Sequence, residues 1–159
     1  MRYILAKLTQ HFEEHAWGNP AHGHLEQYIT TNMEIEHILP CNPRADVRSV
    51  FDKQSEYDDY VQRLGNLTLL EKTINCSVSN GSFEEKVPGY RQSSFLLTRS
   101  LAEKPQVGAK TQLNKAVAEL TPFTKWNSSS IEARQTLLAK IARTVWDMPQ
   151  LAKSGAPGQ

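Results

Sequence analysis

One stretch decides the fold of this chain: MEIEHILP, residues 33–40. Apolar and polar residues alternate through most of it, which is typical of a strand with one buried face, and Pro40 ends the pattern. A second strand is predicted at residues 67–70, LTLL. We therefore expect a two-stranded antiparallel hairpin, with a first strand over 33–39 and a short helix or tight turn over 74–79 after the second.

Helical patterns surround this hairpin on both sides. Apolar residues recur at helical spacing over 2–16, and a hydroxyl followed by acidic residues predicts a helix start at Ser55, with Gly65 as its stop. Further helical segments are predicted over 82–86, 93–103 and 110–119 and, capped by residues 128–130, in a long last helix. The expected fold class is therefore α+β and mostly helical.

The chain has the length of one domain. Its 159 residues suffice for one core but not for two ordinary ones. We expect a single domain over 1–150, with a helical lead-in over 1–30 and helical support for the hairpin over 93–148. The tail over 151–159, rich in small residues, is predicted to be disordered.

Composition excludes several classes of function. A formal net charge of +1 excludes a strongly basic protein that attracts nucleic acid over its whole surface, so any DNA contact must come from local clusters or from another domain or subunit. Two cysteines, Cys41 and Cys76, cannot form a four-thiolate zinc site. The sequence shows no signal peptide and no apolar run of about 20 residues, so we expect a soluble, cytoplasmic protein without membrane contact.

Four polar elements follow one another along the chain: Glu36-His37, then Gly65-Asn66, then Asn75, then Asn80-x-x-Phe83-x-x-Lys86. Each alone has an ordinary explanation. A histidine in a strand is usually a packed core residue, Gly-Asn before a strand is usually turn chemistry, and an asparagine beside a helix is often a cap. These explanations do not account for the order of the elements or for the nine-residue interval from Asn66 to Asn75.

This order resembles the HNH nuclease family, in which two strands and a helix form a finger, the ββα-metal fold, around one metal ion. More specifically, the chain resembles the C-terminal nuclease domain of GmrSD-type, modification-dependent restriction endonucleases. The matching strings are IEHILP (35–40), GNLTLL (65–70) and NxxxSNxxFxxK (75–86), followed by Tyr90, Ser93 and a closing Trp126, Ile131, Arg134 and Trp146. The resemblance covers roughly residues 1–148 and implies a ββα-metal core over 33–86.

The residue types suit phosphodiester hydrolysis. Histidine titrates near neutral pH and can take a proton from water, and a hard cation such as Mg²⁺ takes one or two oxygen ligands from the protein. The resemblance implies that His37 is the general base, that Glu36 and Asn75 hold a divalent metal ion (Mg²⁺, with Mn²⁺ as an alternative), and that Asn66 fixes the loop that aims His37. Folding should then bring the imidazole and the two oxygen donors to a common point.

Two features of Glu36 stand out against this expectation. The better-known members of the family carry Asp at the position of Glu36, which is one methylene longer. Adjacent strand residues also point to opposite faces, so Glu36 and His37 can serve one site only if the strand twists or ends there.

The predicted function is that of a metal-dependent DNA endonuclease domain in a restriction or phage-defence system, which leaves 5′-phosphate and 3′-hydroxyl ends. Asn80, Lys86 and Arg91 are candidate contacts to DNA phosphates, with surface or capping roles equally open. The alternative function is a catalytically inactive nucleic-acid-binding or assembly module of the same fold. Larger proteins of the family join this domain to an N-terminal NTP-hydrolysing domain; the chain has no Gly-rich phosphate-binding loop, so we expect such a partner outside it.

Overall fold

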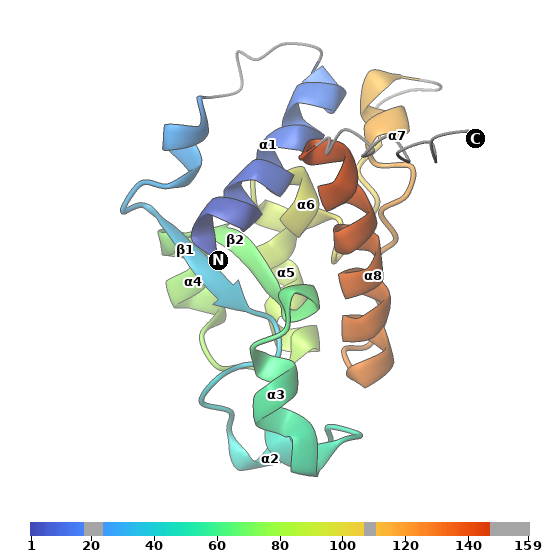
Figure 1. The fold of residues 1–159 in the computed structure, drawn as a ribbon. Coiled ribbons are helices and arrows are strands. Elements are labelled where there is room, and N and C mark those ends of the chain that lie inside the picture. Colours follow the sequence, from blue (N-terminus) through green and yellow to red (C-terminus); the bar gives the residue numbers. More distant parts are fainter. Residues whose placement is uncertain (18–23, 107–110, 147–159) are drawn as a thin grey trace, which may run out of the picture.

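The computed structural model describes residues 1–17, 24–106 and 111–146. These residues form a mostly helical α+β domain around a two-stranded antiparallel sheet, as predicted (Figure 1). In chain order, the elements are α1 (Arg2–Trp17), η2 (Leu25–Tyr28), β1 (Met33–His37), α2 (Ala45–Ser49), η3 (Gln54–Glu56), α3 (Tyr57–Val61), η4 (Leu64–Asn66), β2 (Leu67–Glu71), α4 (Lys72–Val78), α5 (Phe83–Gln92), α6 (Leu96–Arg99), α7 (Gln112–Ala116) and α8 (Ser128–Val145).

The hairpin has the predicted pairing but a shorter first strand. β1 and β2 run antiparallel, with Glu36 opposite Thr68. β1 ends at His37 rather than at residue 39, because the backbone N–H of Leu39 donates to the side-chain oxygen of Asn66 (2.7 Å) instead of to the strand ladder. The strand therefore ends at His37, one residue after Glu36.

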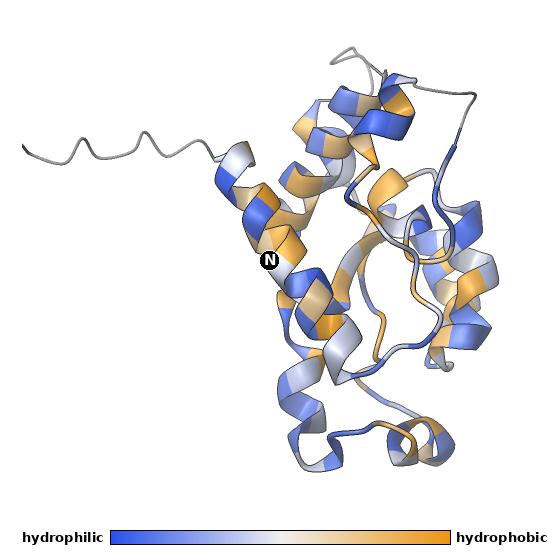
Figure 2. Cartoon of the chain, turned by 90° about the vertical axis from the view of Figure 1, so that its right-hand side faces the viewer, coloured by the Kyte–Doolittle hydropathy of each residue, from blue (hydrophilic) through white to orange (hydrophobic). Residues whose placement is uncertain are grey.

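Helices cover both faces of the hairpin. α1 packs on one face, where Leu5 joins Leu67 and Leu69 in a buried cluster. α4 and α5 lie on the other face, where Leu70 joins Tyr90 in a second cluster (Figure 1). Apolar and polar residues alternate around these helices (Figure 2), so each helix buries one side and exposes the other. Burial on both sides holds β1 in a fixed position.

The helix α8 packs against η4, the turn that leads into β2. A methyl group on Gly65 would come within 2.1 Å of the backbone oxygen of Ile131, so only glycine fits this close approach. The buried Arg134 donates from Nη1 to the carbonyl oxygens of Gly65 (2.8 Å) and Leu67 (2.7 Å). The glycine predicted as a helix stop thus has a packing role, and α8 fixes the backbone on both sides of Asn66.

Three helical segments differ from the prediction in length, and one of them is α7, which covers only Gln112–Ala116 where a helix was predicted over 110–119. α5 has ten residues instead of one turn, because a capping box at Ser82 starts it and the helix continues through Pro88. α6 covers only Leu96–Arg99 rather than 93–103, because the residues before it turn toward β2: the hydroxyls of Ser93 and Ser94 donate to the carboxylate of Glu71.

Other segments differ in their ends or were not predicted. The cap of α8 is Asn127 rather than residues 128–130: its side-chain oxygen accepts from the backbone N–H of Ser130 (3.0 Å). The short elements α2 and η2 were not predicted, because four or five residues are too few to show a helical period. Residue 110 and the predicted segments 147–148 and 151–159 lie outside the described residues. No helix in the described ranges has the length and apolar character needed to cross a membrane.

Candidate functional site

A pocket of about 200 Å³ opens where β1 ends beside α4 and α5. Three separate segments contribute to it, because α4 packs on β1 and α5 packs on α4. Its walls include five of the residues predicted for the site: Glu36, His37, Asn75, Asn80 and Lys86.

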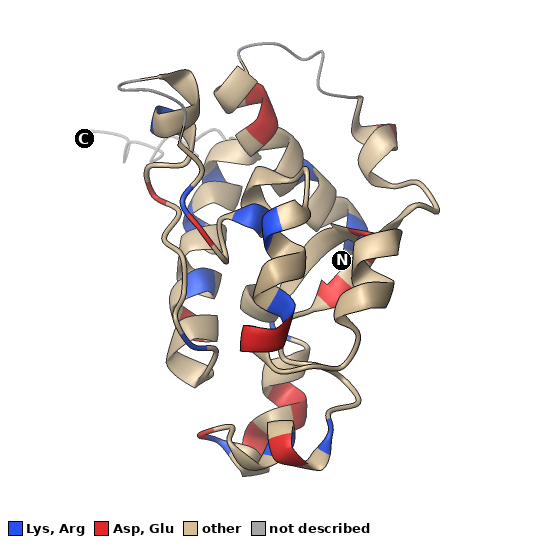
Figure 3. Cartoon of the chain, turned by 180° about the vertical axis from the view of Figure 1, so that it is seen from behind, with Lys and Arg blue, Asp and Glu red and all other residues tan. Residues whose placement is uncertain are grey.

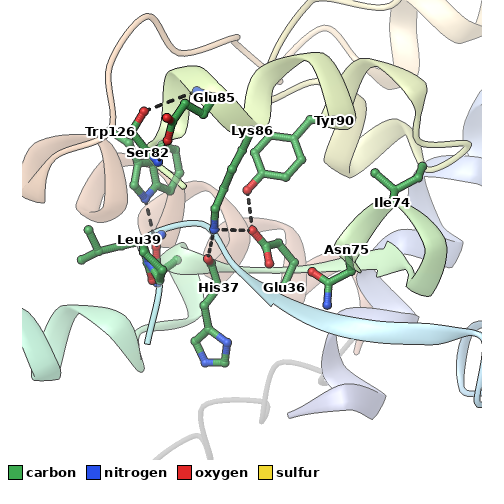
Figure 4. Close-up of polar contacts among 12 residues, drawn as sticks. Glu36, His37, Leu39, Ile74, Asn75, Ser82, Glu85, Lys86, Tyr90 and Trp126 are labelled. Atoms are coloured by element: carbon green, nitrogen blue, oxygen red, sulfur yellow. Dashed lines mark hydrogen bonds and ion pairs between the residues drawn. The ribbon is translucent and has the colours of Figure 1, made fainter. Parts of the chain in front are cut away.

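The carboxylate of Glu36 is fixed through one of its two oxygens. Oε1 accepts hydrogen bonds from Nζ of Lys86 (2.7 Å) and from the hydroxyl of Tyr90 (2.7 Å), as Figure 4 shows. Nζ of Lys86 also donates to the backbone oxygen of His37 (2.8 Å). Among the described residues no group donates to Oε2 of Glu36, which lies on the side nearer to Asn75 (Figure 4). One carboxylate oxygen is therefore tied to the protein, and the other is available to the pocket.

These three side chains form a buried polar cluster. Lys86 and Tyr90 are 0% exposed and Glu36 is 5% exposed. Burial lowers the pKa of the Lys86 ammonium, and the neighbouring Glu36 carboxylate partly offsets this effect. Burial, together with the charge of Glu36, raises the pKa of the Tyr90 hydroxyl well above its ordinary value, so Tyr90 is a neutral donor at physiological pH. The Lys86 ammonium and the Glu36 carboxylate each supply the charge that the other needs in this water-poor setting.

The side-chain amide of Asn75, on α4, is oriented by Glu34. Nδ2 of Asn75 donates to Oε2 of Glu34 at 2.7 Å. A carboxylate only accepts hydrogen bonds, so the amide nitrogen must face Glu34. The amide oxygen then lies on the side that faces Glu36 (Figure 4). Sequence reasoning missed Glu34, although its position two residues before Glu36 placed both on one strand face.

The ring of His37 lies at the end of β1 and is half-buried. It lines the same pocket but points away from the Glu36 carboxylate and the Asn75 amide (Figure 4). The three groups thus share a pocket, but the ring is not turned to the point that the two oxygens face. Burial is the largest influence on His37 and lowers the pKa of its imidazole, while the charge of Glu36 and a hydrogen bond from the ring to the side chain of Gln62 oppose this shift. The ring is therefore neutral at pH 7 and able to accept a proton. Gln62 was not singled out by sequence reasoning.

Asn66 lies outside the pocket, where it ties together the segments around it. Its side-chain oxygen accepts from the backbone N–H of Leu39 (2.7 Å) and from the indole of Trp126 (2.9 Å). Its Nδ2 donates to the backbone oxygens of Leu39 and Val61, both at 3.0 Å. Asn66 is fully buried, and these four bonds fix the residue two positions after His37.

The three candidate phosphate contacts differ in their surroundings. Asn80 lines the pocket. Arg91 does not; it is about half exposed and forms an ion pair with Glu103 at 3.6 Å. Lys86 is buried, and its ammonium already has two acceptors within the protein.

The donor set suits a hard cation with few protein ligands. Oε2 of Glu36 and the amide oxygen of Asn75 are both oxygen donors, the type that Mg²⁺ prefers, and a Mg²⁺ site usually completes its six ligands with water and phosphate. Within the described ranges no group of three or more His, Cys, Asp or Glu side chains is placed to hold a metal. The pocket thus lacks the three or four nitrogen and sulfur ligands of a typical zinc site.

Comparison with known protein families yields one match. The family described as GmrSD restriction endonucleases, C-terminal domain, matches residues 1–141, which is most of the chain. The chain belongs to this family. The GmrSD assignment makes it a nuclease domain of the restriction endonuclease type, for which DNA is the fitting substrate. No curated protein and no solved structure matches the chain significantly.

The GmrSD domain mixes acidic and basic residues on the face seen in Figure 3. Exposed arginines pair with carboxylates nearby. Arg44 bonds Asp46 and Glu85, both at 3.0 Å, and Arg48 bonds Asp58 at 3.2 Å. These arginines are partly neutralised, which accords with the net charge of +1.

Proposed function

We propose that this GmrSD domain is a metal-dependent DNA endonuclease of the HNH, ββα-metal type, with His37 as the general base. One observation carries the proposal: a neutral imidazole and two inward-facing oxygen atoms, on Glu36 and Asn75, line one pocket between β1, α4 and α5. A hairpin followed directly by a helix is the order of elements that the HNH fold requires.

The arrangement of His37 suits in-line hydrolysis. The attacking water and the departing 3′ oxygen lie on opposite sides of the phosphorus in such a displacement. A base that activates water and a cation that stabilises the leaving oxygen therefore belong on different sides of the phosphate. His37, with its ring turned away from Glu36, would take the proton of the water, and its bond to the side chain of Gln62 would limit rotation of the ring.

Glu36 and Asn75 would hold the cation, Mg²⁺ or Mn²⁺, through one oxygen each. The bound cation would supply stabilisation for negative charge on the phosphate and on the leaving oxygen. Lys86 and Tyr90 keep the Glu36 carboxylate in place by occupying its other oxygen. Asn66 holds the segment after β1 and would thereby keep His37 aimed.

The three candidate residues for DNA contacts differ in how readily they could reach a phosphate. Asn80 lines the pocket and is our first candidate for a phosphate contact. Arg91 would have to exchange its bond to Glu103 for one to phosphate. For Lys86 we favour the internal role, since a buried ammonium with two acceptors does not reach a phosphate outside. We further propose that the domain acts in cytoplasmic DNA restriction, against phage among other targets, with an NTP-hydrolysing domain or subunit as partner.

One observation favours the inactive module as a second candidate. The ammonium of Lys86 already neutralises Glu36 at 2.7 Å, and in a protein without cutting activity it would replace the cation as the counter-charge. Titration with Mn²⁺ separates the two functions, because the inactive module would bind no cation at Glu36 and Asn75.

The direct test is cleavage of supercoiled plasmid DNA in Mg²⁺ or Mn²⁺, with and without EDTA. We expect the wild type to cut, and His37→Ala to lose at least about 100-fold in rate, the usual contribution of a general base. His15→Ala, which removes an exposed histidine of α1, is the matched control and should cut like the wild type. Equal cleavage by wild type and His37→Ala would remove His37 from the mechanism.

A further inference from the structure

We propose that Glu34 is a positioning residue: it fixes the side-chain amide of Asn75 so that the amide oxygen faces the pocket as a cation ligand. The inference rests on the proposed function, because it assigns the Asn75 oxygen to a bound cation. It adds a residue that the motif around Glu36 and His37 does not include.

The geometry of β1 and α4 carries this inference. Glu34 and Glu36 are two residues apart on β1, so both side chains leave the strand on the face that α4 covers. Asn75 therefore meets two carboxylates. It gives its NH₂ group to Oε2 of Glu34 at 2.7 Å, and its oxygen lies on the side of Glu36.

The hydrogen bond selects one of two amide orientations. If the amide of Asn75 turned by 180°, its oxygen would lie against the Glu34 carboxylate at the distance where its nitrogen now lies. Two acceptor atoms would then repel each other, and the NH₂ group would face the cation. A free asparagine has no such preference, so Glu34 converts an ambiguous side chain into an oxygen donor.

A purely electrostatic role for Glu34 is the competing explanation. The other oxygen of Glu34 lies 4.0 Å from Nζ of Lys72, which is 56% exposed. At that distance and exposure the ion pair contributes little. The charge of Glu34 could nevertheless attract a cation from a distance, and the test has to separate charge from orientation.

Two substitutions of Glu34 separate these explanations. Glu34→Asp keeps the charge but withdraws the acceptor by one methylene, so the bond to Asn75 breaks. Glu34→Gln keeps the length but removes the charge, and its own NH₂ can bond the Asn75 oxygen and hold the amide in the wrong orientation. Lys72→Gln is the control, because it removes the neighbouring charge and leaves the bond to Asn75 intact. The side chain of Glu34 is about one-third exposed, so these variants should fold.

The first readout is Mn²⁺ binding to the free protein, measured by electron paramagnetic resonance without DNA. We expect both Glu34→Asp and Glu34→Gln to weaken binding by about 10-fold or more, the usual loss when a group that orients a metal ligand is removed. Lys72→Gln should bind Mn²⁺ at least as well as the wild type. Wild-type affinity in Glu34→Asp would overturn the inference, because charge alone would then explain Glu34.

The second readout needs no cation. In ¹⁵N-labelled protein the side-chain amide of Asn75 should show slow solvent exchange and a downfield proton, as expected of a bond to carboxylate, and both signatures should disappear in Glu34→Asp. Unchanged Asn75 signals in that variant would overturn the inference whatever the metal data show. If the wild type binds no Mn²⁺ while the amide signatures respond to Glu34→Asp, the metal proposal fails and the orienting role of Glu34 stands.

Discussion

Replacing Lys86 with methionine tests the buried cluster beneath the pocket. The ammonium of Lys86 is fully buried and makes two hydrogen bonds, at 2.7 Å to Glu36 and at 2.8 Å to the backbone oxygen of His37. Methionine has a similar length and fills the space, but it leaves the Glu36 carboxylate, itself 5% exposed, without a counter-charge. Breaking a buried ion pair from one side costs about 3–5 kcal/mol. We expect Lys86→Met to lower the free energy of unfolding by that amount.

Urea denaturation followed by circular dichroism measures this loss, and a double variant identifies its cause. Glu36→Gln combined with Lys86→Met removes both charges, so it should recover most of the stability that Lys86→Met alone loses. Tyr90→Phe, which removes only a neutral donor to the same oxygen, should cost about 1–2 kcal/mol. The reasoning fails if Lys86→Met costs less than about 1 kcal/mol, or if Glu36→Gln restores nothing.

Three further predictions concern the pocket and its support. The neutral form of His37 is the proposed base, and burial lowers the pKa of its imidazole. The cleavage rate should therefore stay flat through neutral pH and fall only below the pH at which an ordinary histidine protonates. A pH–rate profile in which the rate already falls at or above the ordinary histidine pKa would contradict this. Gly65→Ala should lower the free energy of unfolding by about 1–3 kcal/mol, because the added methyl group would lie 2.1 Å from the backbone oxygen of Ile131. If urea denaturation shows unchanged stability, α8 can move away to make room for the methyl group. Alkylation of Cys41, which lines the pocket, should block cleavage in a Cys76→Ser background. Alkylation of Cys76, which does not line it, should leave most of the activity in a Cys41→Ser background. Equal inhibition in both backgrounds would show that cleavage does not take place at this pocket.

The hairpin and the two long helices were predictable because their signals are local. Alternation over residues 33–37 and helical spacing over 2–16 each lie within one element, and the apolar residues of both elements pack against one core cluster, with Met33 and Ile35 partly buried there. The length of α5 was not predictable in the same way. Pro88 lies inside α5 and removes one backbone donor, but burial of Phe83 and Tyr90 in the core outweighs this loss.

The candidate site, too, was predictable only in part. The choice of Glu36, His37 and Asn75 as candidate residues follows from the family resemblance that their order along the chain carries, and the structure places all three at one pocket. The contacts of Lys86 and Glu34 could not be predicted from the order of residues along the chain. A lysine on a helix is usually exposed, and only the packing of α5 near the end of β1 makes Lys86 a buried partner of Glu36. Glu34 meets Asn75 across 41 residues of sequence, so no local pattern signals their contact.

The two proposed metal ligands share one arrangement of their polar atoms. Glu36 and Asn75 each commit one polar atom to the protein and leave one oxygen to the pocket. Because Lys86 cancels the charge of Glu36, the free pocket should attract a dication only weakly, and the missing negative charge can come from the DNA phosphate itself. With this charge balance, the proposed site would bind a dication more tightly in the presence of DNA than in the free domain. Such a dependence would suit the proposed nuclease, because the cation would be held most tightly when DNA occupies the site.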